Sequence, residues 1–115
     1  MKIIEHLVNG LKIAEIISGD VIIRTTEDSL DLMGNIYYQG FDKLVIHEKN
    51  ITPDFFDLKN GMAGEILQKF SNYRIQLAII GDFDKYDSKS LKDFIRESNK
   101  GRLVNFVNSV EEILG

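Results

Sequence analysis

The stretch GMAGEILQKFSNYRIQLAIIGD, residues 61–82, decides how the rest of the sequence is interpreted. Residues 61–73 space their apolar side chains as one face of a helix does: Met62, Ala63, Ile66, Leu67 and Phe70. Residues 75–80 are apolar except for Gln76, which is typical of a strand covered on both faces in a parallel sheet. The stretch therefore predicts a helix that packs across a sheet, followed by a central strand of that sheet.

Apolar runs on the N-terminal side predict the neighbouring strands. Residues 3–8 and 11–17 flank Asn9-Gly10, a dipeptide typical of a type I′ hairpin turn because both turn residues need positive φ. We therefore expect an antiparallel hairpin at the start of the fold. Residues 43–47 fit a parallel strand, and residues 21–23 fit either a short strand or an apolar plug under the next helix.

Capping signals predict two more helices that would cover the sheet. Thr26 is followed by acids, which fits the N-cap of a helix over residues 27–39 that Gly40 ends. Ser88 fits the N-cap of a helix over residues 89–99. Because right-handed crossovers connect parallel strands, these helices would pack on the sheet.

The C-terminal part of the chain completes the expected fold. Residues 103–107 predict a last strand, and Ser109 with Glu112 has the spacing of a capping box at the start of a short helix. The whole pattern predicts one α/β domain over residues 1–115. Its mixed sheet would have four to six strands with an N-terminal antiparallel hairpin, and about four helices.

The composition is that of an ordinary globular domain. The chain has 115 residues, of which 43% are hydrophobic and 28% charged, and a net charge of −4. This length fits a single domain. No basic stripe and no alternation of basic and aromatic residues gives the pattern of a nucleic-acid-binding surface. We therefore expect no nucleic-acid partner.

The absence of cysteine excludes disulfide bonds, thiolate metal ligands and a cysteine nucleophile. No apolar run approaches the roughly 20 residues that a membrane-spanning helix needs. The opening residues lack the pattern of a secretion signal. These features predict a cytosolic protein without a membrane span.

Polar residues follow two of the expected parallel strands. His47, Glu48 and Asn50 come after one strand, and Asp82 comes after the next. In open α/β sheets, ligands bind outside the carboxyl ends of the strands, so these residues are candidates for one site. A histidine beside a carboxylate suits a general base, and His47, Glu48 and Asp82 also suit a metal. The alternative is that they satisfy loop and helix-cap backbone groups.

The loop before the central helix offers further candidates. Asn60 and Gly61 lie where a helix N-terminus presents unpaired backbone N–H groups to an anion. Phe55 and Phe56 follow Pro53 as an exposed-looking pair that fits a partner-binding patch or a lid. Because aromatic side chains mostly bury their large area, we favour burial, with one ring at the end of the core and the other packed on Tyr73.

The segment Gly61-Met62-Ala63-Gly64 lacks the lysine and the serine or threonine of a phosphate-binding loop. We predict no cofactor. We expect Gly61 and Gly64 instead to let the helix and its loop approach closely. His6 alternates with apolar residues and is expected on a solvated strand edge.

Several segments resemble a bacterial family of uncharacterised proteins, domain of unknown function 4180. They are residues 47–58 (HEKNITPDFFDL), 61–70 (GMAGEILQKF), 81–83 (GDF), 88–91 (SKSL) and 97–102 (ESNKGR). This resemblance covers nearly the whole chain and implies no activity.

The order of the elements also looks like that of the STAS domains, the anti-sigma-factor antagonists and their relatives. Those domains carry an Asp-Ser-Ser-Gly-Leu-type motif whose last serine is phosphorylated. Asn60 takes the place of that serine here and Gly61 that of the glycine. The resemblance therefore implies a partner-binding surface without the phosphorylation switch.

These observations predict a small regulatory or binding module that is not an enzyme and that binds a protein partner or a small ligand. The expected binding residues are His47, Glu48, Asn50, Phe55, Phe56, Asn60, Gly61 and Asp82. The alternative is a small hydrolase or metal-dependent enzyme that uses His47, Glu48 and Asp82. A homodimer through the edge of the opening hairpin is a further expectation.

Overall fold

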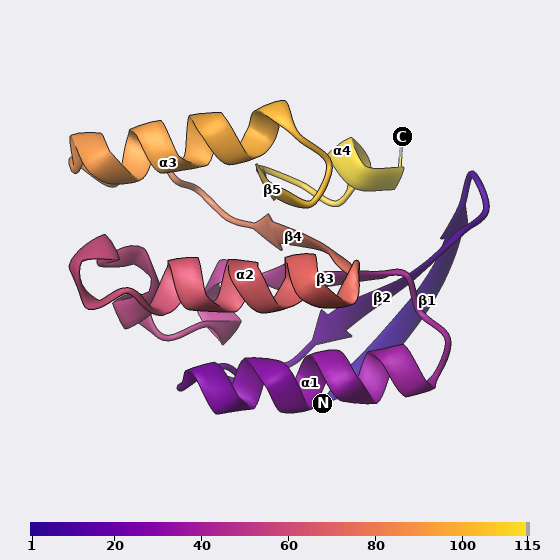
Figure 1. Ribbon diagram of the computed structural model, residues 1–115. Helices are drawn as coiled ribbons and strands as arrows, with labels where there is room; N and C mark the ends of the chain where they lie inside the picture. The colour runs from indigo at the N-terminus through magenta and orange to yellow at the C-terminus, as the bar shows by residue number, and fades with distance from the viewer. Residues whose placement is uncertain (115) are drawn as a thin grey trace.

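The structure, a computed structural model, describes residues 1–114 and contains one five-stranded mixed sheet (Figure 1). The strands lie side by side in the order of the chain, with β1 antiparallel to β2 and every other pair parallel. They are β1 Lys2–Val8, β2 Leu11–Ile17, β3 Lys43–His47, β4 Gln76–Ile80 and β5 Val104–Val107. The predicted α/β class, mixed sheet and N-terminal hairpin are confirmed.

Four α-helices accompany the sheet in the described chain, as the sequence predicts. They are α1 Thr26–Tyr38, α2 Met62–Tyr73, α3 Lys89–Lys100 and α4 Glu111–Leu114. Three single-turn 3-10 helices, η1 Glu48–Asn50, η2 Pro53–Phe56 and η3 Leu58–Asn60, form the connection between β3 and α2. Helices α1, α2 and α3 lie over one face of the sheet (Figure 1), because each right-handed crossover joins neighbouring parallel strands.

The turn between β1 and β2 has the backbone that its sequence predicts. Asn9 has φ 51° and Gly10 has φ 81°, the two positive values of a type I′ turn. This turn pairs Val8 with Leu11 and fixes the register of the hairpin.

Residues 21–23 form a plug and not a strand. Ile23 is buried and makes only an isolated bridge to Ile51. The backbone N–H groups of Ile22 and Ile23 both donate to the carbonyl oxygen of Asn50, at 2.7 and 3.0 Å. The segment therefore satisfies its backbone against the loop after β3, outside the sheet.

The N-cap of α1 is Thr25, one residue before the predicted Thr26. The Thr25 hydroxyl accepts a hydrogen bond from the Asp28 backbone N–H, and the Asp28 carboxylate accepts one from the Thr25 N–H, both at 3.1 Å. This reciprocal capping box needs an acid three residues after the cap, and Asp28 supplies it only for Thr25. The other predicted helix ends lie within two residues of the observed ones.

The second face of the sheet is covered over part of its area by α4. Successive strand residues point to opposite faces, so Ile13 and Val45 lie away from α1, α2 and α3. They form a small cluster with Ala78 and Ile80, against which Ile113 of α4 packs. Glu15 and His47, two strand residues that contact each other, lie on this same face.

Candidate functional site

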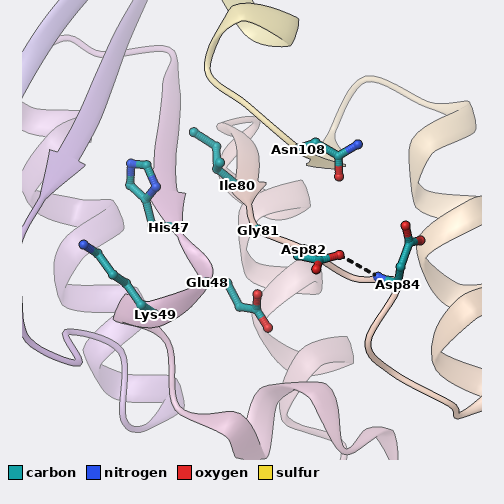
Figure 2. A pocket seen from close by; sticks show the side chains of 8 residues that line it. All are labelled: His47, Glu48, Lys49, Ile80, Gly81, Asp82, Asp84 and Asn108. Atoms are coloured by element: carbon teal, nitrogen blue, oxygen red, sulfur yellow. Dashed lines mark hydrogen bonds between the residues drawn. The ribbon is translucent and has the colours of Figure 1, made fainter.

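A depression of about 520 Å³ lies at the carboxyl ends of β3 and β4 (Figure 2). His47 ends β3 and is paired with Ile80 at the end of β4, so parallel pairing brings the two following loops to one edge of the sheet. The residues that line it are His47, Glu48, Lys49, Ile80, Gly81, Asp82, Asp84 and Asn108. The structure thus brings three of the predicted site residues, His47, Glu48 and Asp82, to one depression.

His47 is paired with a residue that sequence interpretation missed. Its Nε2 lies 3.3 Å from Oε2 of Glu15 on β2, and the same carboxylate places Oε1 at 2.9 Å from Nε2 of His6 on β1. Glu15 is only 7% exposed, so both histidines of the sequence contact one buried carboxylate. Such a contact holds the His47 ring at a fixed orientation.

His6 lies on the edge strand β1, as expected, but it is half-buried because of the contact with Glu15. The position of Glu15 within a strand is the feature of the sequence that could have identified it. It falls on the same face as Ile13, a position where a sheet residue is usually apolar, so a charge there needs a partner.

Glu48 is engaged by the loop after β4. Its Oε2 lies 2.9 Å from Nζ of Lys85 and accepts a hydrogen bond from the Tyr86 hydroxyl. Burial, and then the hydrogen bond to Glu48 and its charge, raise the pKa of Tyr86 above its ordinary value. Glu48 also packs so closely on Gly81 that a Cβ there would lie 2.7 Å from the Glu48 Cβ. This carboxylate ties two loops together and is not free to act as a base.

His47, Glu48 and Asp82 contact different partners in this structure. His47 and Glu48 point away from each other in Figure 2, and Asp82 Oδ1 accepts a hydrogen bond from the Asp84 N–H at 3.2 Å. Among residues 1–114, no group of three His, Asp or Glu side chains could hold a metal ion. The metal site expected as an alternative is not found, because consecutive residues after a strand diverge to different partners.

Asn50 is completely buried and holds the loop after β2. Its Nδ2 donates to the carbonyl oxygens of Ser18 and Asp20, each at 2.8 Å. Within the described part of the chain, its Oδ1 has no hydrogen-bond partner. Asn50 does not line the depression, so its position supports the structural alternative.

Phe55 and Phe56 are buried, so the expected burial in the core is confirmed and an exposed patch at these rings is not found. Their rings meet edge to face at 5.0 Å, and Phe56 stacks on Tyr86 at 5.2 Å between centroids. The single turn η2 directs both rings inward. The ring contact of Phe56 is with Tyr86, whereas Tyr73, on which one of the two rings was expected to pack, is 56% exposed.

Asn60 and Gly61 shape the start of α2 but do not line the depression. Asn60 Oδ1 accepts a hydrogen bond from the Met62 N–H at 2.9 Å, and its Nδ2 donates to the Asp54 carbonyl oxygen at 2.7 Å. Glycine suits position 61 because the backbone there has a φ of 77°, in the left-handed region. The expected close approach at Gly61 and Gly64 is wrong, because an added Cβ would meet nothing within 4 Å at either position.

Lys49, Asp84 and Asn108 are site residues that sequence interpretation missed. Lys49 lies in η1, next to the predicted pair, and Asp84 lies two residues after Asp82. Asn108 directly follows β5. His47 and Asp82 were selected because ligands bind outside the carboxyl ends of the strands, and the same argument also selects Asn108.

A family model described as Domain of unknown function (DUF4180) matches residues 8–115. No curated protein and no solved structure matches the chain. The resemblance stated from the sequence is therefore confirmed for the uncharacterised family, whereas the STAS likeness stays a prediction. In the described part of the chain, no helix is long and apolar enough to cross a membrane.

Proposed function

The chain belongs to the DUF4180 family, which has no assigned function, and we propose from the site itself that it is a module that binds a small polar ligand. The ligand would occupy the depression at the carboxyl ends of β3 and β4. The observation that carries this proposal is the position, at this edge, of a depression of about 520 Å³ whose lining residues are mainly polar or charged. Small-molecule sites of open α/β sheets occur at this edge and commonly span about 300–1,000 Å³.

The charges around the depression favour a ligand that carries both signs. Lys49 lies on one side, and Asp82 and Asp84 lie on the other (Figure 2). An anionic group near Lys49 and a cationic group near the two aspartates would each meet the opposite charge. Asn108 would add a donor and an acceptor beside the aspartates.

His47 has one ring nitrogen beside Glu15, which leaves its other nitrogen for the ligand. Because Glu15 is buried, the imidazole is held in place before the ligand arrives, which lowers the conformational cost of binding. Ile80 gives the depression an apolar wall. A hydrolase built on His47, Glu48 and Asp82 gains no support, because Glu48 is engaged elsewhere.

The first test is native mass spectrometry of the protein purified gently from its own cells, followed by an amide NMR titration. The probes are a mixture of free amino acids, which are zwitterions, and a mixture of nucleoside monophosphates, which are anions. We expect a discrete added mass, or shifts confined to residues 47–49, 80–84 and 108 with the amino acids.

The Lys49→Ala variant should weaken binding roughly 10- to 100-fold, since a charged hydrogen bond contributes about 1.5–3 kcal/mol. Lys59→Ala is the matched control, because Lys59 is also an exposed lysine in a single-turn helix but does not line the depression. A chain without an added mass that gives no shifts with either mixture would contradict the proposal. Equal losses in both variants would also contradict it.

A further inference from the structure

A second hollow, of about 620 Å³, lies between α1 and α2, away from the proposed ligand site. The two helices lie side by side and run in the same direction (Figure 1), so their C-terminal ends meet. The residues that line the hollow are Leu30, Met33, Gly34, Tyr37, Tyr38, Lys69, Asn72 and Tyr73. We call this surface the tyrosine groove.

The tyrosine groove exposes an unusual amount of aromatic surface. Tyr37, Tyr38 and Tyr73 are 57%, 91% and 56% exposed. At 150–250 Å² for a ring, they expose about two whole tyrosines, or roughly 300–500 Å², in each copy of the chain. If two copies bury these rings against each other, they supply about half of the 1,200–2,000 Å² that a stable interface needs.

Gly34 forms a notch in this groove. It lies inside α1, where glycine lowers helix stability relative to alanine. A Cβ at Gly34 would meet no atom within 4 Å, and its φ does not lie in the left-handed region. No contact within the described chain therefore requires glycine at this position. A group from another molecule that packs onto the helix here would require it.

Tyr38 is the group that fits the notch. It lies four residues after Gly34, so the two positions face the same side of α1 about 6 Å apart along the helix axis. Two α1 helices that pack antiparallel about a two-fold axis between these positions would place each Tyr38 over Gly34 of the other copy. A two-fold interface satisfies a protruding ring and a notch on the same surface at once.

The charges at the two ends of this helix pair favour the same arrangement. Glu27 lies in the first turn of α1 and Glu65 in the first turn of α2, at the end of the pair opposite to Tyr38 and Tyr73. Lys69 lines the groove one turn before the end of α2, and Arg74 is the C-cap of that helix. Antiparallel packing sets the acidic end of one copy against the basic end of the other, which is electrostatically complementary.

We propose that the tyrosine groove is the interface of a symmetric homodimer, in which Tyr38 of each copy packs on Gly34 of the other. The interface lies on the helical layer and leaves the edge strand β1 unpaired. It is independent of ligand binding at the strand ends.

The test is sedimentation equilibrium of the full chain from low micromolar to millimolar concentration. We expect a monomer–dimer equilibrium whose Kd rises roughly tenfold or more in Gly34→Gln and in Tyr38→Ser, as for central interface residues. The matched control is Gly64→Gln, because Gly64 also lies in a helix with free space around it but not in the groove. Far-UV circular dichroism verifies that each variant is folded.

A wild-type chain that stays monomeric at millimolar concentration would overturn the proposal. So would a dimer of unchanged Kd in both Gly34→Gln and Tyr38→Ser, which would move the interface to the edge strand β1. Because Tyr38 is almost fully exposed, its replacement cannot disturb the core, so a loss of association in this variant reports on the interface alone.

Discussion

Gly81→Ala is expected to destabilise the protein, although alanine is compatible with the backbone at this position. The φ of Gly81 lies outside the left-handed region, so the substitution creates no backbone strain. The added Cβ would lie 2.6 Å from Oε1 of Glu48, 2.7 Å from the Glu48 Cβ and 3.1 Å from Cζ of Phe83. Glu48 cannot move aside freely, because Lys85 and Tyr86 hold its carboxylate.

The expected loss is about 2 kcal/mol in the free energy of unfolding. Overpacking a well-packed site costs about 1–3 kcal/mol, and displacement of Glu48 weakens a charged hydrogen bond of about 1.5–3 kcal/mol. Alanine also lowers the conformational entropy of the unfolded chain, which stabilises the folded state by about 0.4–1 kcal/mol and offsets part of this loss. For a chain of this length, the loss corresponds to roughly 6–12 °C in Tm.

Urea unfolding followed by far-UV circular dichroism measures this effect, which suits a chain without tryptophan. Gly19→Ala is the matched control, because a Cβ at Gly19 meets nothing within 4 Å, and it should change stability by less than about 0.5 kcal/mol. In a Glu48→Gly background, the two shortest contacts are absent, so Gly81→Ala should cost at least about 1 kcal/mol less. An alanine variant as stable as the wild type, or an equal cost in both backgrounds, would refute the reasoning.

Three further predictions concern single side chains. Burial and the contact with Glu48 raise the pKa of Tyr86, so the folded state holds the phenol proton more tightly than the unfolded state does. The stability that this contact contributes should therefore be intact below about pH 10 and should fall above it. Urea midpoints measured from about pH 7 to 11 should fall less steeply in Tyr86→Phe than in the wild type. Asn50→Ala should cost about 2 kcal/mol by urea unfolding, because two carbonyl oxygens lose their donor; an unchanged midpoint would show that water replaces it. Gly34→Ala should raise stability by about 0.5–1 kcal/mol in thermal melts at low concentration, as should Gly64→Ala, and a destabilised Gly34→Ala would reveal a contact within the chain.

The sequence predicts the features of this fold that depend on local spacing. Asn9-Gly10 specifies its turn through backbone conformations that few other pairs adopt, and residues 61–80 specify a helix and a strand through their apolar periods. The predicted N-cap of α1, Thr26, lies one residue after the observed N-cap, Thr25. Both threonines precede acids, and only the reciprocal hydrogen bonds with Asp28 distinguish them.

The candidate site depends on contacts between residues that are far apart in the sequence. Glu15 and His47 meet only because β2 and β3 pair in a particular register, which no local pattern reveals. Gly81 likewise owes its importance to Glu48, a residue of another loop. The strand ends predicted where the depression lies and three of the residues that line it, His47, Glu48 and Asp82, but not Lys49, Asp84 or Asn108.

The order of the strands has a consequence for how the chain folds. Every two strands that pair in the sheet are also consecutive in the sequence, so no pairing has to wait for a strand that is synthesised later. Folding rates rise when contacts are close in sequence. Among the described elements, the hairpin of β1 and β2 is synthesised before the others, and each later strand pairs with an edge that already exists.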